Sequence, residues 1–500
     1  MTDTDVQTLP VIGLEIHVEL ATATKMFCRC PNRFGDAPNT HTCPVCIGMP
    51  GALPVMNRQA VEYAMRVGTA LDCRLPDFTK WDRKSYYYPD LPKNYQISQY
   101  SLPLATGGRL EVPLPDGSVK PVGIIRAHLE EDAGKNVHDF PGHTGVDLNR
   151  AGVPLLEIVT HPHLNGVEEV LTFARSMQRL VRWLGVSEAN MQMAHMRFEP
   201  NISLWVGDPG KVFDESAGHF TPIFEVKNLN SFRALERTCA WAIDYHRAQL
   251  AEKGPAWSLA EVGKQNWGWR DDLNACEFQR GKEEAHDYRY FPDPDLAPVL
   301  VDDEWRQAIR AGIGELPLAR KKRYRTDYDL TDADADALTA DAPTGDLLDA
   351  AAAAGADPRR CVNLLLGRGA AIANERGCLI GEIGIAADQL AELARMLADG
   401  KVNATAGDRI FEKMLADGGA PGEIAEAEGL LAVSDAGQIG EWVEQALAAN
   451  PQAVEDVRAG GKKQKKAFGF LTGRVMQISR GAADPAEVQK LLRQRLEVRG

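Results

Sequence analysis

Four cysteines near the start of the chain form two close pairs. Cys28 and Cys30 make one pair, and Cys43 and Cys46 follow after twelve residues that include two prolines and a glycine. Four thiols in this arrangement suit one tetrahedral zinc ion, because the turn residues let the chain fold back until both pairs meet. Disulfides are the weaker interpretation, since the remaining cysteines show no pairing pattern. We therefore expect a structural zinc site.

Acidic and imidazole side chains alternate with apolar ones just before this cluster. In the segment 11–20, Glu15, His17 and Glu19 occupy every second position. On a strand these three side chains share one face, about 7 Å apart. Two carboxylates and an imidazole can hold a divalent cation, and Mg²⁺ prefers such oxygen-rich sites. The alternative is the exposed face of an ordinary strand, which this segment alone does not exclude.

A second acidic group lies in the segment 128–135, which reads HLEEDAGK. On a strand His128, Glu130 and Asp132 would share a face, and Glu131 would point to the other. Massed carboxylates repel one another unless a cation or a phosphate complex lies among them. Further polar residues occupy strand-like segments at 197–203 and 225–230. Because buried polar groups must be paired, so many of them predict a polar cleft.

Several common enzyme motifs are missing from the sequence. It has no G-x-x-x-x-G-K-[ST] loop, no G-x-G-x-x-G opening a helix, no G-x-S-x-G elbow and no amidase signature. A bound nucleotide would therefore depend on metal ions and on side chains of an open sheet. The segment 84–100 carries five tyrosines, which could stack on a base or ribose or could pack beneath a proline-rich loop.

The elements that must position these residues change in character along the chain. Up to Pro298 strand signals dominate, and one helix is predicted at 167–184 from apolar residues at helical spacing. Beyond Pro298 the composition is helical, with an interruption at 400–407 (GKVNATAG). We predict an α+β protein. Its expected domains are an antiparallel-sheet domain, a helical domain and a small all-α tail, at 1–298, 299–404 and 405–500.

Charge and hydropathy restrict the possible partners. The net charge of −14 argues against non-specific coating of nucleic acid, and we expect no DNA partner. The segment 457–500, however, holds eleven Lys or Arg against three acidic residues, a local balance of +8. Four of its lysines could contact a phosphate backbone, or they could form a solvated helical face. These are Lys462, Lys463, Lys465 and Lys466. With no long apolar run and no signal core, a cytoplasmic protein without a membrane span is expected.

Long motifs in a fixed order resemble one family over nearly the whole chain. These are GLEIHVEL (13–20), the cysteine cluster, YYYPDLPKNYQISQY (86–100), HLEEDAGKNVH (128–138), DLNRAGVPLLEIVT (147–160), EVKNLNSF (225–232), HDYRYFPDPDL (286–296) and GFLTGRVMQISRGAADP (469–485). They are similar to the B subunits of bacterial and organellar tRNA-dependent amidotransferases.

The resemblance implies a fold, a reaction and partners. The first domain would be a cradle similar to the catalytic fold of glutamine synthetase. The family's B subunit uses ATP and Mg²⁺ to phosphorylate the side-chain carboxylate of Glu-tRNA(Gln) or Asp-tRNA(Asn). Ammonia that a separate amidase subunit releases from glutamine then displaces phosphate, and a small third subunit completes a heterotrimer. Family likeness also assigns the tail to binding of misacylated tRNA. The sequence does not decide between the two tRNA substrates.

The resemblance also implies roles for individual residues. The four cysteines match the zinc ligands, and Lys135 stands where the family has a lysine. Four residues match the magnesium and phosphate residues: Glu15, His17, Glu130 and Glu131. Glu199 is expected to take a catalytic role. Four others are expected to bind the nucleotide: Arg197, Asn201, Lys227 and Asn228.

The chain departs from the family pattern in three places. The family's R-C-D-x-N is RFEPN here (197–201), so the acid at Glu199 is one methylene longer. Two acids of a family motif are His161 and His163 here, and the segment 265–271 also differs. Two alternatives to an enzyme subunit are a zinc-bearing RNA-binding module and a scaffold with a decayed site. The retained Glu15, His17, Glu130 and Glu131 count against the scaffold, whereas the RNA-binding module would need no carboxylate cleft.

Overall fold

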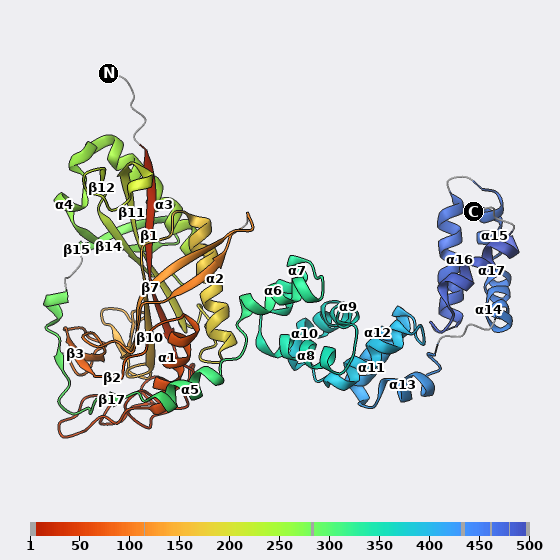
Figure 1. Cartoon of the computed structure of the whole chain (residues 1–500), viewed down its shortest axis with the longest axis horizontal. Coiled ribbons are helices and arrows are strands. Elements are labelled where there is room, and N and C mark those ends of the chain that lie inside the picture. The colour runs from red at the N-terminus through yellow and green to blue at the C-terminus, as the bar shows by residue number, and fades with distance from the viewer. Residues whose placement is uncertain are drawn as a thin grey trace, which may run out of the picture. The chain divides into compact units, whose positions relative to one another are not determined.

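The structure, a computed structural model, describes residues 7–114, 116–281, 285–431, 436–460, 463–479 and 481–496. The chain divides into two compact units, Met1–Leu316 and Pro317–Gly500 (Figure 1). The first unit contains the large sheet and the second is helical, so the predicted α+β fold with an antiparallel-dominated sheet and a helical C-terminal region is confirmed.

One ten-stranded sheet forms the centre of the first unit. Its main path runs β15 (Ala275–Gly281), β14 (Lys264–Arg270), β13 (Ile223–Lys227), β11 (Met196–Gly207), β1 (Thr8–Glu19), β10 (Pro154–Thr160), β7 (Val119–Glu131) and β5 (Ala105–Thr106). At its sides β12 (Gly218–Phe220) pairs with β11, and β6 (Arg109–Pro113) pairs with β7. Every pairing is antiparallel except that of β13 with β14.

Strand β1 shows why the two faces of this sheet differ. Leu14, Ile16 and Val18 are buried in the main hydrophobic core, whereas the residues between them are only partly buried. The core also takes in apolar residues of α1 (Arg58–Ala70), α2 (Val167–Trp183) and α3 (Phe232–Lys253), which cover that face. The predicted helix at 167–184 is thereby confirmed as α2. The opposite face of the sheet carries the polar residues.

Small sheets bring a late segment of this unit back to an early one. β16 (Phe291–Pro292) pairs with β3 (Asp82–Ser85), which pairs with β4 (Tyr95–Ser98). β17 (Val299–Leu300) pairs with β2 (Phe78–Thr79), and β8 (Lys135–Val137) pairs with β9 (Gly145–Asp147). The chain then forms α5 (Asp303–Ala311), which packs on α1. The tyrosine-rich segment 84–100 and the motif at 286–296 therefore become neighbours.

Two separate hydrophobic cores organise the second unit. The first core, from Tyr324 to Leu430, joins α6 (Pro317–Asp327), α7 (Asp332–Leu338), α8 (Ala342–Ala353), α9 (Pro358–Leu364), α10 (Ala370–Arg376), α11 (Ala387–Ala398), α12 (Ala404–Asp417) and α13 (Pro421–Ala427). The second core, from Ile439 to Leu496, joins α14 (Ala436–Ala449), α15 (Pro451–Arg458), α16 (Gln464–Ile478) and α17 (Pro485–Leu496).

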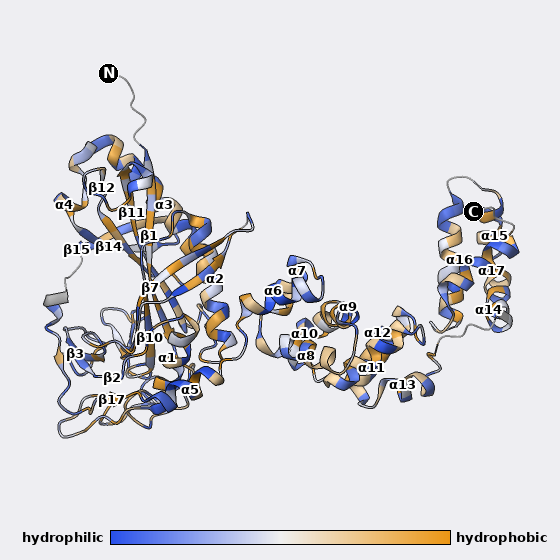
Figure 2. Cartoon of the chain, in the orientation of Figure 1, coloured by the Kyte–Doolittle hydropathy of each residue, from blue (hydrophilic) through white to orange (hydrophobic). Residues whose placement is uncertain are grey.

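Helices of both cores carry hydrophobic and hydrophilic residues together (Figure 2). Among the described residues, no helix combines the length and apolar composition needed to cross a membrane. Of the interruption predicted at 400–407, residues 400–403 lie between α11 and α12, whereas 404–407 already belong to α12. However, α12 and α13 pack in the first of the two cores. Among the described residues, this core therefore extends to Leu430, and the second core begins at Ile439.

Candidate active site and metal centres

The register of the sheet brings polar residues from distant segments onto one face. His17 on β1 lies opposite Glu157 of β10 and Arg197 of β11, and Glu157 lies opposite His128 of β7. Residues directly opposite each other on paired strands point to the same face. The antiparallel pairing thus assembles one polar surface from distant segments of the chain. His17 and Arg197, for example, are 180 positions apart.

The first metal-binding group on this surface consists of His17, Glu130 and Glu157, whose ligand atoms lie within 4.8 Å of one another. His17 Nε2 is 3.6 Å from Glu157 Oε2 and 4.0 Å from Glu130 Oε1. Both carboxylates are buried. One imidazole and two buried carboxylates form a donor set that suits a divalent cation.

The electrostatics of this group fit a cation as well. Burial opposes the charge on His17, but the hydrogen bond to Glu157 and the nearby Glu199 raise its pKa to about 9. Burial works against ionisation of Glu157, yet His128 and His17 hold the pKa of that carboxyl well below its usual range. The group therefore stores a proton on His17 beside the anionic Glu157, whereas burial raises the pKa of Glu130. A metal ligated by histidine needs the neutral imidazole, so a cation would replace that proton.

A second group consists of Glu15, Glu199 and Glu225, whose ligand atoms again lie within 4.8 Å of one another. Its member on β1, Glu15, precedes His17 by two residues. Asn201 Nδ2 donates to Glu15 Oε1 at 3.2 Å. Lys227 Nζ is 2.9 Å from Glu225 Oε1 and 3.2 Å from Glu199 Oε2. Burial would lower the pKa of Lys227, but Glu199 and Glu225 outweigh it and raise that pKa. Three carboxylates with one lysine can accept a divalent cation or a cation–phosphate complex.

Two members of these groups were not identified from the sequence. Glu157 and Glu225 both lie inside motifs quoted for the family resemblance, but neither was assigned a role. A signal was available for Glu157, because it is the one charged residue in the otherwise apolar strand 154–160 (PLLEIVT). An acid buried in such a strand needs a partner. Glu225 carries a weaker signal, its alternation with Lys227.

Not every predicted residue reaches the two groups. Glu131 points to the other side of β7, where it pairs with Lys93 and accepts from the Ile97 N–H at 3.0 Å. Lys135 is exposed on β8. Asn228 is exposed just after β13, with a φ of 69°.

Arg197 lies beside the groups and contacts Asp132. Its Nη2 donates to Asp132 Oδ2 at 3.0 Å, and Arg150 Nε is 3.5 Å from the same oxygen. Burial would raise the pKa of Asp132, but Arg197 and Arg150 lower it to about 2. The departing residues His161 and His163 stack on each other with ring centroids 5.3 Å apart, at the end of β10 and outside both groups.

Aromatic and cationic side chains line the side of the first group. Lys84 Nζ is 3.9 Å from Glu130 Oε2 and 5.2 Å from the ring centroid of Tyr288. The rings of Tyr100 and Tyr290 stack with centroids 4.1 Å apart, and Arg126 lies 5.5 Å from the Tyr100 centroid. The segments 84–100 and 286–296 thus form one aromatic wall beside the carboxylates.

The four predicted zinc ligands come together in the first unit. Cys28, Cys30, Cys43 and Cys46 have sulfur atoms within 4.8 Å of one another, and none is in a disulfide. The Cys43 N–H donates to Cys46 Sγ at 3.2 Å. Hydrogen bonding from Cys28 is the main influence that lowers the pKa of Cys46 to about 4. This donor set fits a tetrahedral metal ion that prefers thiolate ligands.

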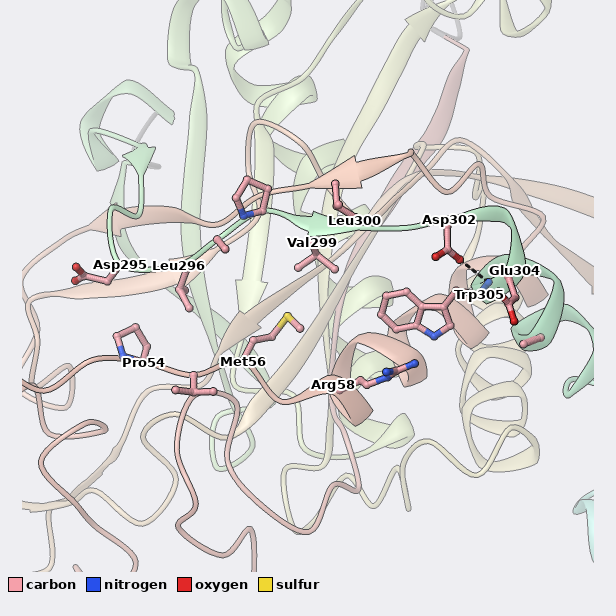
Figure 3. Close-up of a pocket in the computed structure, with 14 residues that line it drawn as sticks. Pro54, Met56, Arg58, Asp295, Leu296, Val299, Leu300, Asp302, Glu304 and Trp305 are labelled. Atoms are coloured by element: carbon pink, nitrogen blue, oxygen red, sulfur yellow. Dashed lines mark hydrogen bonds between the residues drawn. The ribbon is translucent and has the colours of Figure 1, made fainter.

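A pocket of about 810 Å³ lies elsewhere in the first unit, between the start of α1, β17 and α5 (Figure 3). Val299, Leu300 and Trp305 form its apolar lining, with Arg58 and Asp302 among its polar residues. None of the predicted site residues lines it. The chemistry therefore concentrates on the polar face of the sheet and not in this pocket.

Three of the four tail lysines lie in the described part of the second unit. Lys463, Lys465 and Lys466 are exposed at the start of α16, while Lys462 lies outside the described residues. The other basic run, 320–325, is different, because its Arg320, Lys321 and Arg323 pair with aspartates of α7 and α8.

Comparison with known proteins identifies the relatives of the chain. Residues 10–307 match the family described as the GatB/GatE catalytic domain, and residues 346–496 match the GatB domain. Three relatives are each named as the B subunit of aspartyl/glutamyl-tRNA(Asn/Gln) amidotransferase. The protein of Moorella thermoacetica is 42% identical over 97% of this chain and 99% of its own length. Those of Carboxydothermus hydrogenoformans and Geobacter sulfurreducens are 41% identical over 97% of this chain and 98% and 99% of theirs.

These matches extend over both structural units and include the strands that carry the two carboxylate groups. The chain belongs to the family of B subunits of the aspartyl/glutamyl-tRNA(Asn/Gln) amidotransferases.

Proposed function

We propose that this chain activates the side-chain carboxylate of a misacylated tRNA, Glu-tRNA(Gln) or Asp-tRNA(Asn), by transferring the terminal phosphoryl group of ATP to it. Ammonia from a partner amidase subunit then displaces phosphate and yields the amide. A carboxylate is a poor electrophile because its charge repels the amine. Phosphorylation removes that charge and supplies a leaving group.

The paired carboxylate groups on one sheet face are the observation that carries this proposal. His17, Glu130 and Glu157 would hold one Mg²⁺, and Glu15, Glu199 and Glu225 would hold a second. When bound, the cations would neutralise the charge on the transferring phosphoryl group. The closeness of Glu199 to Glu15 and Glu225 supports a ligand role despite its extra methylene.

Cationic side chains at both groups have complementary tasks. Lys227, which bridges Glu199 and Glu225, would contact a phosphate oxygen, and Asn201 would orient Glu15. Lys84 stands at the first group beside Glu130 and the aromatic wall. In this proposal Lys84 meets the negative charge that develops on the carbonyl oxygen when ammonia attacks the acyl phosphate, because a preorganised cation stabilises charge that develops during the reaction.

The remaining parts serve assembly and substrate binding in this proposal. The missing amidase signature supports a separate amidase subunit. In this proposal a small third subunit completes the complex, which acts in the cytoplasm. The four cysteines hold a structural zinc ion. The exposed lysines at the start of α16 contact the backbone of misacylated tRNA, for which a basic surface on an acidic chain is suited.

Reconstitution with the partner subunits tests the activity. We expect ATP hydrolysis that depends on misacylated tRNA, with formation of Gln-tRNA(Gln) or Asn-tRNA(Asn). The Glu157→Gln variant should lose both activities. The Glu169→Gln variant should keep them, because Glu169 belongs to neither group and its carboxylate lies 2.7 Å from Lys120 Nζ. Binding of tRNA without any ATP hydrolysis in the wild-type complex would instead support the RNA-binding module.

A further inference from the structure

Lys25 is a fully buried lysine beside the four-cysteine site. Its exposed fraction is 0%, and it is among the largest completely buried side chains of the chain. The ammonium group donates to the backbone oxygens of His41 at 2.7 Å and Leu148 at 3.1 Å, and it lies 3.7 Å from Cys46 Sγ.

A buried ammonium requires a nearby negative charge, because desolvation of an unpaired ion is costly. Among the described residues, no Asp or Glu forms an ion pair with Lys25. The carboxylate of Glu131 approaches the same place near Gly152, but it is paired with Lys93. The sulfur of Cys46 is therefore the one contact of Lys25 in the described chain that can carry a negative charge.

The four-cysteine site supplies this charge once it holds a metal. Four thiolates carry more negative charge than Zn²⁺ neutralises, so the loaded site stays anionic. An anion of this kind below the protein surface is itself costly without a counter-charge. The positive charge of Lys25 and the negative charge of the loaded metal site thus balance each other.

The partners of Lys25 also connect this site to the carboxylate surface. Leu148 and the next two residues form one short segment. Asn149 Oδ1 accepts from the His41 N–H at 2.8 Å, and Arg150 donates to the oxygens of Ala133 and Gly134 at 3.0 and 2.7 Å. Arg150 also approaches Asp132, which binds Arg197.

Backbone hydrogen bonds also link the two sites. The Met26 N–H, next to Lys25, donates to the Gly152 oxygen at 2.8 Å, and the Gly152 N–H donates to the Asp132 oxygen at 2.9 Å. A change at the metal site can therefore reach Asp132 through two short hydrogen-bonded steps.

We propose that Lys25 is the built-in counter-cation of the four-cysteine metal site and that it transmits occupancy of that site to the segment 148–153, which positions Arg150 against Asp132. Lys25 is a positioning residue, and its role rests on the proposed zinc site. The opposite view is that Lys25 only ties two carbonyl groups together, in which case its effect would not depend on thiolate charge.

Zinc release from the full-length chain tests the charge. We expect Lys25→Met to release zinc to excess chelator about 10- to 100-fold faster than wild type, the range typical of groups that support metal ligands. Lys25→Arg, which keeps the charge, should remain within about threefold of wild type. Lys120→Met is the control, because Lys120 is a half-buried lysine whose ammonium group pairs with Glu169 and not with a cysteine.

A spectroscopic measurement separates a charge effect from a fold defect. With Co²⁺ in place of zinc, removal of the ammonium near Cys46 should shift the thiolate-to-cobalt charge-transfer band in Lys25→Met but not in Lys25→Arg or Lys120→Met. Unchanged zinc release and an unchanged band in a folded Lys25→Met protein would overturn the proposal.

A double variant separates the charge of the site from the loss of the lysine side chain. Cys46→His lowers the negative charge of the site by one, so Lys25→Met should release zinc with a smaller penalty in that background than in wild type. Equal penalties in both backgrounds would overturn the charge argument. Absence of zinc from the wild-type chain prepared under reducing conditions would instead defeat the zinc-site proposal itself.

Hydrogen exchange tests the connection to the carboxylate surface. Removal of zinc from wild type should speed exchange in peptides that cover 131–134 and 148–153, because the Gly152–Asp132 pairing would loosen. In Lys25→Met, zinc should protect these peptides much less. Protection that is the same with and without zinc in wild type would refute the transmission.

Discussion

The cysteine site and the carboxylate groups are both clusters of metal-binding side chains, but the chain builds them in opposite ways. The cysteines come from a single segment, 28–46, folded back on itself. The carboxylate groups draw on β1, β7, β10, β11 and β13, and they exist only when these strands are in register. A local site can therefore be recognised from the spacing of its residues in the sequence, whereas a site on a sheet depends on which strands pair.

The two sites should also differ in what their loss does. A metal held by one loop stabilises that loop, while carboxylates massed on a sheet face repel one another and serve chemistry at some cost in stability. Variants in each site can therefore test this difference.

The largest expected effect is on catalysis at the first carboxylate group. Glu157→Gln should lower the rate of tRNA-dependent amidation by about 10²–10³-fold or more, because charge stabilisation at the phosphoryl group is lost. Its unfolding midpoint should stay close to that of wild type. Amidation assays with the Glu169→Gln control decide this. Amidation at the wild-type rate would remove Glu157 from the site.

Loss of a thiol should act on stability first. Cys43→Ser should abolish binding of one zinc per chain and destabilise the first unit by on the order of several kcal/mol, since metal binding is coupled to folding. Metal analysis and thermal unfolding measure the two effects. Cys73→Ser is the control, because Cys73 is half-buried and lies outside the metal site. A zinc-free chain with unchanged unfolding would contradict the structural role.

The charge state of His17 predicts a pH dependence for the carboxylate groups. Its pKa is raised to about 9, so below that pH the imidazole carries a proton that a cation must displace. Mg²⁺ affinity should therefore rise by up to about tenfold per pH unit between pH 7 and 9 and then level off. Titration calorimetry in buffers of different ionisation enthalpy would detect the released proton. His17→Gln should bind more weakly and lose this slope.

The smallest effect is expected at the tail. Neutralising Lys463, Lys465 and Lys466 together should weaken tRNA binding about equally for all sequences. The slope of log affinity against log salt should fall by about one for each phosphate that is no longer neutralised. Binding measured across a salt titration shows this. Lys413→Gln serves as control, because Lys413 is ion-paired with Glu428 in the first core of the second unit. An unchanged salt slope in the triple variant would rule out the interaction.

A truncation at the tail can be placed more exactly with the structure. The interruption at 400–407 suggested a cut near Gly407, but α12 and α13 belong to the preceding core. A chain ending after Leu431 should keep that core and lose tRNA affinity, whereas a cut at Gly407 should also destabilise the helical region. Equal unfolding of both truncated chains would contradict this packing.

Much of the fold could be read from local patterns. Alternation in β1 and the helical spacing in α2 are properties of a few consecutive residues, and both elements are where the patterns place them. The pairing partners could not be read in the same way, because register depends on contacts between separate strands of the chain. For that reason Glu157 and Glu225 joined the candidate site only with the structure, and Glu131 was left outside it.

The sequence alone determined the four-cysteine site, the polar face of β1, the helical C-terminal region and, through its long motifs, the family. These depend on spacing and on consecutive residues, which no partner strand can alter. Only the tertiary structure decided which carboxylates meet, that Lys25 lies buried against Cys46, and where one helical core ends and the next begins. Each of these follows from packing and strand register, which bring together side chains whose separation along the chain carries no signal of their contact.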